Sequence, residues 1–142
     1  MPISIKPICD FLDSADLLKR VPKELLPLAK NRLPWTGYLV FTGDETLVGM
    51  CAFKAEPSEQ KDVEIAYFTF PEYERKGYAT DMARLLVSLA KESDETEIVF
   101  ANTLRTENAS ARICRRLGFE FKGGVMDPED GLVWHWRKSV GR

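Results

Sequence analysis

The sequence has few cysteines and no long apolar run, and each absence excludes a class of protein. Its three cysteines, Cys9, Cys51 and Cys114, are scattered along the chain, so they show neither a metal-binding spacing nor the even number of a disulfide framework. No stretch approaches the ~18 apolar residues that a membrane-spanning helix needs. The start of the chain lacks the basic residues followed by an apolar segment that mark a signal peptide. These features predict a protein of the reducing cytoplasm, with no metal and no membrane partner.

The sequence also lacks an excess of charge of either sign. Its 20 basic and 22 acidic residues give a net charge of −2, which offers no electrostatic case for binding nucleic acid. It contains neither Gly-x-x-x-x-Gly-Lys-Ser/Thr nor Gly-x-Gly-x-x-Gly, the phosphate-binding motifs of nucleotide enzymes. These absences argue against a nucleotide enzyme. The length and the 44% of hydrophobic residues predict one globular domain over residues 1–142.

The apolar pattern predicts an α/β fold, with a mixed central β-sheet flanked by helices. Ser14 and Asn108 are the expected N-caps of the first and last helices. Gly118 follows the last helix, where a left-handed residue is favoured. The strands are expected at residues 3–9 (or an ordered arm there), 37–42, 47–54, 62–70, 97–103, 119–125 and 132–137, and the helices at 14–20, 22–30, 79–93 and 108–117.

The turn between the expected strand 62–70 and the helix that follows it predicts an anion-binding site. The first N–H groups of a helix have no partner within the helix, and the helix dipole favours negative charge there. Gly77 lets a ligand approach the backbone because it has no Cβ, and Arg75 and Lys76 add positive charge. A plain strand-to-helix turn is the alternative. The helix itself is indicated by one apolar stripe: Met82, Leu85, Leu86, Leu89 and Ala90.

Two motifs in this sequence resemble those of the GNAT superfamily, the acyl-CoA-dependent N-acetyltransferases. The spacing Glu74-x-x-Gly77-x-Ala79 is similar to the family's pyrophosphate loop, Gln/Arg-x-x-Gly-x-Gly/Ala, and departs from it at Glu74. Residues 101–119 are similar to the family's second motif, with Asn108-Ala109-Ser110 near a helix start and Leu117-Gly118-Phe119 at its end. The resemblance spans at least residues 37–137. It implies a single-domain GNAT-like fold, acetyl-CoA as co-substrate and no metal.

The resemblance also implies which residues hold the cofactor. The backbone of Phe68, Thr69 and Phe70 would bind the acyl and pantetheine amides, while the side chains of these three residues are more ordinarily part of the core. Asn108 would bind the pantetheine arm, which is compatible with its role as a helix cap. The full set of expected cofactor-binding residues is Phe68, Thr69, Phe70, Glu74, Arg75, Lys76, Gly77, Tyr78, Ala79, Thr80, Asn108 and Ser110.

Two residues are candidates for proton transfer. Glu64 lies on the central strand, where several family members carry a general base that acts through water; a salt-bridged strand glutamate is the alternative. Cys114 takes the position where many members have a tyrosine that serves as general acid. Its more ordinary interpretation is a small buried helix residue. Tyr67 is a further possible donor without a specific argument, as are Tyr73 and Tyr78. His135, the single histidine, is more often a packing or surface residue than a catalyst.

The resemblance implies an N-acetyltransferase that moves an acetyl group from acetyl-CoA to a primary amine by direct attack in a ternary complex. The amine is expected on a small molecule or at a peptide or protein N-terminus. The alternative is a non-catalytic CoA-binding or regulatory module of the same fold, because Glu74 and Cys114 depart from the family pattern. A monomer or homodimer is typical of the family.

Overall fold

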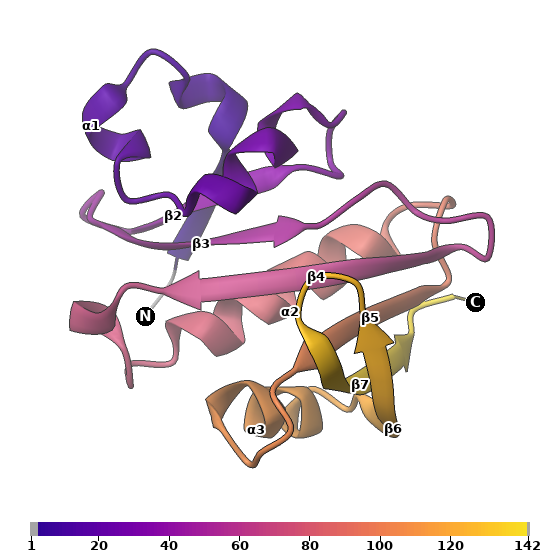
Figure 1. Ribbon diagram of the computed structural model, residues 1–142. Helices are drawn as coiled ribbons and strands as arrows, with labels where there is room; N and C mark the ends of the chain where they lie inside the picture. Colours follow the sequence, from indigo (N-terminus) through magenta and orange to yellow (C-terminus); the bar gives the residue numbers. More distant parts are fainter. Residues whose placement is uncertain (1–2, 142) are drawn as a thin grey trace.

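The computed structural model describes residues 3–141, whose strands form one seven-stranded sheet in the order β1-β2-β3-β4-β5-β7-β6 (Figure 1). Neighbouring strands are antiparallel except β4 and β5, which are parallel. The predicted α/β fold with a mixed sheet is therefore confirmed. The strands are β1 (Ile3–Pro7), β2 (Gly37–Thr42), β3 (Leu47–Phe53), β4 (Asp62–Thr69), β5 (Ile98–Thr103), β6 (Glu120–Asp127) and β7 (Gly131–Ser139).

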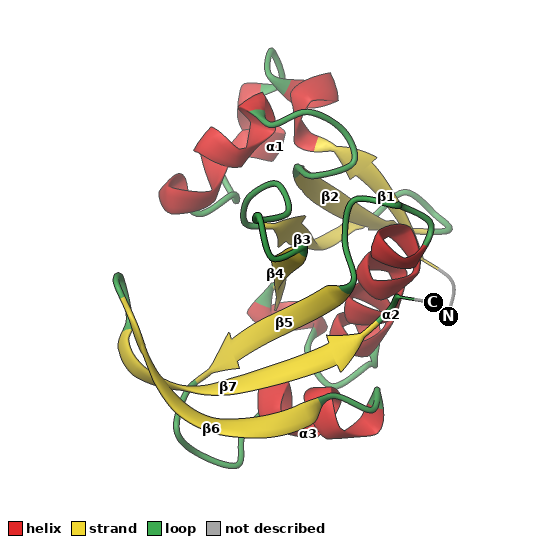
Figure 2. Cartoon of the chain, turned by 90° about the vertical axis from the view of Figure 1, so that its right-hand side faces the viewer, coloured by secondary structure: helices red, strands yellow, loops and turns green. Residues whose placement is uncertain are grey.

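Helices cover the two faces of the sheet (Figure 2). On one face, α2 (Tyr78–Lys91) packs on β3 and β4, and α3 (Ala109–Arg116) packs on β5 and β6. On the other face, two 3₁₀ helices, η1 (Ile8–Phe11) and η2 (Lys23–Lys30), contact β2. A third 3₁₀ helix, η3 (Pro71–Tyr73), joins β4 to the turn before α2.

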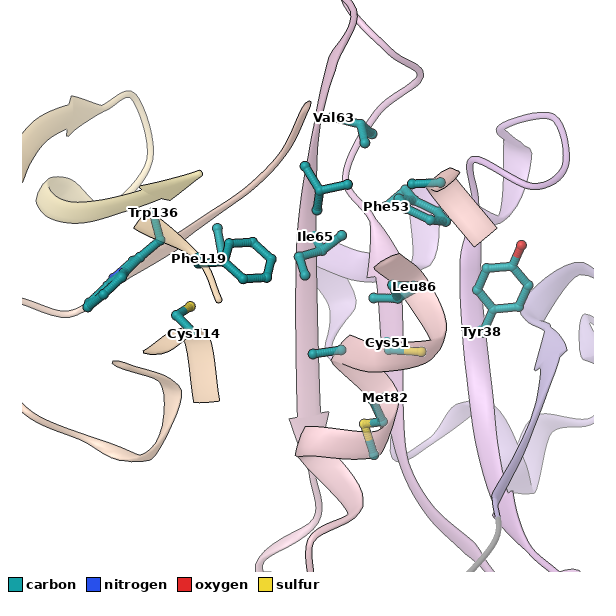
Figure 3. Close-up of a cluster of buried hydrophobic side chains, with 14 of the residues drawn as sticks. Tyr38, Cys51, Phe53, Val63, Ile65, Met82, Leu86, Cys114, Phe119 and Trp136 are labelled. Carbon is teal, nitrogen blue, oxygen red and sulfur yellow. The ribbon is translucent and has the colours of Figure 1, made fainter. Parts of the chain in front are cut away.

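The two faces of the sheet bury two hydrophobic clusters. Along β2, Leu39 and Phe41 point into the cluster beneath the N-terminal segments, whereas Tyr38 and Val40 belong to the larger cluster on the α2 face. This alternation follows from the two-residue period of a strand, and it explains why all of β2 is buried. Figure 3 shows part of the larger cluster, to which β4 contributes Val63 and Ile65 and α2 contributes Met82 and Leu86.

The predictions for the N-terminal helices were partly wrong. The first α-helix is a single turn, α1 (Ala15–Leu18), and the Ser14 side chain makes no capping hydrogen bond. The second helix is the 3₁₀ helix η2, with Pro27 inside it. Proline lacks an N–H group and clashes with the preceding turn, so it disfavours a continuous α-helix here.

At the other end of the chain, Gly118 has the expected left-handed conformation, with φ of 86°.

Strands β4 and β5 are paired over only part of their length. The parallel register joins Asp62, Val63 and Glu64 to residues 98–100 and then stops. From Ile65 to Thr69, β4 pairs with β3 alone, and β5 diverges from it (Figure 1). The end of β4 therefore has one edge that is not covered by another strand.

The opposite edge of β4 is held very close to β3 at Gly49. A Cβ atom at this position would lie 2.1 Å from the Phe68 carbonyl oxygen and 2.9 Å from the Met82 Cε. Backbone atoms cannot yield to such a contact, so glycine is required here for steric reasons. Gly49 thus fixes how β3, β4 and α2 meet.

We expect Gly49→Ala to destabilise the fold by at least ~2 kcal/mol, because the added methyl must push β4 away from β3. The matched control is Gly43→Ala, since a Cβ at Gly43 has no heavy atom within 4 Å. Urea unfolding of the parent and both variants measures the difference. Equal free energies of unfolding for the two variants would contradict the close approach at Gly49.

Candidate functional site

A cavity of about 630 Å³ lies where β4 ends and α2 begins. Its wall comes from the end of β4, from η3, from the turn that follows and from one side of α3. We call it the large cavity. Of the twelve residues expected to bind a cofactor, Lys76, Phe70 and Asn108 do not line it. The other nine do: Phe68, Thr69, Glu74, Arg75, Gly77, Tyr78, Ala79, Thr80 and Ser110.

The turn before α2 has an unusual backbone. Gly77, the N-cap of α2, is left-handed with φ of 85°, and Arg75 is left-handed with φ of 67°. Left-handed residues in a turn direct successive N–H groups to one side, which is how anion-binding nests form. The Arg75 conformation is uncommon for a residue with a side chain, and such strain concentrates at functional sites. The helix has no side-chain cap at Gly77, so a ligand can approach its first turn.

The backbone of β4 alternates between a paired and an unpaired edge. The N–H of Lys54 donates to the Glu64 carbonyl and the N–H of Phe70 donates to the Val48 carbonyl, both at 2.9 Å. Because successive residues of a strand direct their backbone groups to opposite edges, Glu64, Phe68 and Phe70 face β3. Tyr67 therefore directs its N–H and C=O to the edge from which β5 has diverged.

Thr69 lies on the same edge as Tyr67 and has a further feature. Its Oγ1 is buried and, within the described chain, has no hydrogen-bond partner. The backbone groups available for a ligand are thus those of Tyr67 and Thr69. Phe68 and Phe70 were named with Thr69 from the sequence, and Phe70 contributes no free N–H because its own is bonded to Val48.

A second cavity of about 190 Å³, the small cavity, is lined mainly by residues of β4 and β5. Glu64 and Lys54 line it, and so does Asp130 from the turn between β6 and β7. Among the described residues, Tyr67 and Ser110 line both cavities. A group that is bound in the large cavity along the free edge of β4 therefore lies next to the small cavity where it reaches Tyr67 and Ser110.

Glu64 is a largely buried carboxylate that lies beside a lysine. Its side chain is 19% exposed and its Oε2 lies 3.7 Å from the Lys54 Nζ. Burial raises the pKa of Glu64 from its ordinary value of 4.5, and the nearby carboxylates Asp127, Asp130 and Glu129 raise it as well. The positive charge of Lys54 opposes this shift. A carboxylate with a raised pKa is a better base near neutral pH.

Cys114 is buried, with 1% of its surface exposed, and belongs to the larger hydrophobic cluster (Figure 3). It lines neither cavity. Burial raises the pKa of its thiol. Its polar neighbour is the Tyr67 hydroxyl, at 3.7 Å from the Sγ. This environment favours a packing role for Cys114 and brings Tyr67, which had no specific argument in the sequence, to the centre of the site.

Other residues have structural partners. The Asn108 Oδ1 accepts the Ala111 N–H at 2.9 Å, which confirms the predicted helix cap. The His135 Nδ1 lies 2.7 Å from the Oδ1 of Asn102, a residue that lines the small cavity, but His135 itself lines neither cavity.

One contact beside the site had no signal in the sequence. Arg20 makes two hydrogen bonds to Glu72, at 2.7 and 2.9 Å, and its guanidinium lies 3.8 Å from the centre of the Phe70 ring. These contacts join the segment after α1 to η3, which borders the large cavity.

The comparison with known families identifies the chain. The sequence profile of the Acetyltransferase (GNAT) domain matches residues 13–120, which is more than half of the sequence. The chain therefore belongs to the GNAT acetyltransferase family. Among the curated proteins, none is similar enough in sequence to count as a relative.

Solved structures of acetyltransferases share the fold. An apo structure of the ribosomal L7/L12 alpha-N-protein acetyltransferase RimL superposes with a TM-score of 0.76 over 99% of this chain and 94% of that one, at 15% identity. Spermidine N-acetyltransferase from Vibrio cholerae, with CoA and spermine bound, gives a TM-score of 0.65 over 74% of this chain and 65% of that one, at 12% identity. At these identities the likeness concerns the fold alone.

Two further similar structures contain the cofactor. RimL in complex with coenzyme A matches 73% of this chain and 61% of its own length, at 18% identity and a TM-score of 0.65. The acetyltransferase yncA from Salmonella typhimurium, with acetyl-CoA, matches 77% of this chain and 66% of its own, at 14% identity and a TM-score of 0.64. In these two superpositions the chain thus covers less than two thirds of the other chain's length.

The described residues, 3–141, lack two features. No helix among them is long and apolar enough to cross a membrane. No cluster of three or more His, Cys, Asp or Glu side chains among them has the arrangement of a metal site.

The charge environment of Glu64 gives a direct test. We expect carbon-detected NMR titration to place the pKa of Glu64 above 4.5, and Lys54→Met to raise it further, because the opposing positive charge is lost. Lys30→Met removes an exposed lysine at the end of η2 and serves as the control. An unchanged or lower pKa in Lys54→Met would show that the ion pair does not act on Glu64.

Proposed function

We propose that the chain is one N-acetyltransferase domain that transfers an acetyl group from acetyl-CoA to a primary amine by direct attack in a ternary complex. The observation that carries this proposal is the free edge of β4 at Tyr67 and Thr69, which leads into the left-handed turn and the open first turn of α2. Peptide-like groups pair well with such an edge, and phosphates with such a helix start.

Acetyl-CoA has the matching chemistry in the same order. Its pyrophosphate would bind at the turn from Arg75 to Gly77 and the first turn of α2, within the large cavity. Its pantetheine amides would extend along the free edge of β4 and pair with the backbone of Tyr67 and Thr69. This places the thioester where the large and small cavities meet. Glu74 is exposed, so its carboxylate can turn to solvent while the backbone of the turn binds the anion.

The amine would enter through the small cavity, beside Glu64. Its nitrogen attacks the thioester carbon, the C–N bond forms and the C–S bond breaks. Glu64 accepts the proton of the amine, directly or through water. Alignment of the two reactants supplies much of the catalysis, since orientation alone is worth roughly 7–11 kcal/mol. The names of the similar structures indicate protein N-termini and spermidine as acceptors of those proteins, which supports an amine acceptor here.

The proposed cofactor site is tested by replacing Gly77 with Asn and with Asp, two side chains of nearly the same shape that differ in charge. Asn and Asp both tolerate the left-handed conformation of this position, and a Cβ here meets no heavy atom within 4 Å. We expect Gly77→Asp to weaken acetyl-CoA binding at least ~10-fold more than Gly77→Asn, because only Asp adds a negative charge beside the pyrophosphate. Calorimetry on the folded variants measures both affinities. Equal affinities would contradict a pyrophosphate at this turn.

The reaction is tested at Glu64. Thiol release from acetyl-CoA is first measured with a panel of primary amines and peptides. With an active acceptor, we expect Glu64→Gln to lower kcat by ~10²–10⁴, with little change in acetyl-CoA affinity. Glu59→Gln, on the exposed loop before β4, is the control.

The pH dependence adds a second readout. With an acceptor whose amine is neutral over the whole range, kcat/KM of the parent should fall as the pH drops through the raised pKa of Glu64, and this limb should be absent in Glu64→Gln. A parent that binds acetyl-CoA but acetylates no amine would favour a non-catalytic CoA-binding module.

A further inference from the structure

Tyr67 lines both cavities, and its hydroxyl lies against Ser110, which lines both cavities as well. Tyr67 lies on β4, and its side chain crosses to α3, where the hydroxyl is 3.5 Å from the Ser110 carbonyl oxygen and 3.7 Å from the Cys114 Sγ. Tyr67 and Ser110 are the described residues that line both cavities. Tyr73 and Tyr78 line the large cavity and not the small one.

The Tyr67 hydroxyl donates to the Ser110 carbonyl at 3.5 Å, a contact that a ligand with a better acceptor can replace. Good hydrogen bonds from a hydroxyl are 2.5–3.0 Å long, so both of its contacts on α3 are long and weak. A hydroxyl carries one donor and two acceptor sites. It can therefore keep the Cys114 thiol as a donor to its oxygen while its own proton points elsewhere.

We propose that the Tyr67 hydroxyl is a catalytic hydrogen-bond donor to the sulfur of acetyl-CoA as the C–S bond breaks. This inference rests on the proposed acetyl transfer and adds the group that stabilises its leaving thiolate. As the amine nitrogen bonds to the carbonyl carbon, the electron pair of the C–S bond moves onto sulfur. The developing negative charge is met by the O–H of Tyr67, and a charge-assisted hydrogen bond of this kind is stronger than a neutral one.

The proton of Tyr67 stays on its oxygen throughout. A phenol has an ordinary pKa of about 10 and a thiol of about 8.5, so transfer from phenol to thiolate is unfavourable. Burial raises the pKa of Tyr67 further, and its contact with Cys114 adds to this. The amine proton leaves through Glu64, and the thiolate takes a proton from water when CoA is released. Tyr67 therefore acts by electrostatic stabilisation, and no tyrosinate forms.

With Tyr67 as the donor, Cys114 needs no catalytic role, although it takes the position of the tyrosine that many family members use as general acid. Cys114 is 1% exposed and lines neither cavity, so it cannot reach a ligand there. Its Sγ instead contacts the hydroxyl of Tyr67, which lines both cavities. In this proposal the hydrogen-bond donor is Tyr67 of β4. Cys114, at the helix position where many family members have a tyrosine, is the small residue that packs beside it.

The test is Tyr67→Phe, which removes one oxygen and keeps the ring. We expect kcat to fall by ~10²-fold, the effect of losing one donor to a developing negative charge. Acetyl-CoA affinity should stay within about threefold, because the backbone of Tyr67 is unchanged. The pH profile should keep its shape at the lower rate, since no proton leaves Tyr67.

Tyr38→Phe is the matched control. Tyr38 is a buried tyrosine of β2 whose hydroxyl donates to the Pro34 carbonyl at 2.6 Å, and burial raises its pKa to about 12. It lines no part of either cavity. We expect it to lose stability and to retain the parent kcat.

Three outcomes overturn the inference. A Tyr67→Phe enzyme that keeps kcat within ~10-fold of an active parent shows that the hydroxyl is not used. Loss of a basic limb from the pH profile shows proton transfer in place of a stationary hydrogen bond. If the unmutated protein transfers no acetyl group to any amine, both the proposed function and this inference are wrong. An assay of the unmutated protein alone distinguishes this outcome from the first two.

Discussion

The divergence of β5 from β4 is the constraint on which the site depends. The two strands pair from Asp62 to Glu64 and no further, so β4 continues with one edge paired to β3 and the other open. A strand edge without a neighbour offers N–H and C=O groups in a regular row. The same divergence leaves room for the large cavity on one side and for the small cavity beside Glu64. The proposed cofactor site and the proposed acceptor site thus both follow from one interrupted pairing.

The end of β4 is held from both sides, which keeps this edge in place. Gly49 allows β3 to approach the Phe68 carbonyl closely, and the Arg20–Glu72 ion pair connects the N-terminal segment to η3. The ion pair is exposed and contributes little stability by itself, but its guanidinium also covers the Phe70 ring. The left-handed turn at Arg75 and Gly77 then starts α2 directly beyond the strand. A ligand that spans strand and helix start meets groups whose positions are already fixed.

The parts of this arrangement that could be predicted from the sequence are local ones. The turn at Gly77 and the helix after it follow from a glycine and a stripe of period 3.6, and the Asn108 cap follows from its place before α3. Pro27 is a sequence signal against a continuous α-helix at residues 22–30, where the structure has the 3₁₀ helix η2. The contact of Tyr67 with Cys114 joins residues 47 positions apart, and that of Arg20 with Glu72 joins residues 52 apart. No local pattern carries such pairs, because only the tertiary fold brings them together.

The most direct measurement of the central claim is amide hydrogen exchange along β4, residue by residue, with and without acetyl-CoA. Without the ligand, the amides of Phe68 and Phe70 should be protected by β3, and those of Tyr67 and Thr69 should exchange fast. With saturating acetyl-CoA, Tyr67 and Thr69 should gain protection while Phe68 and Phe70 change little. Tyr67 and Thr69 amides that exchange equally fast in the saturated complex would contradict an acyl-CoA bound along the free edge of β4.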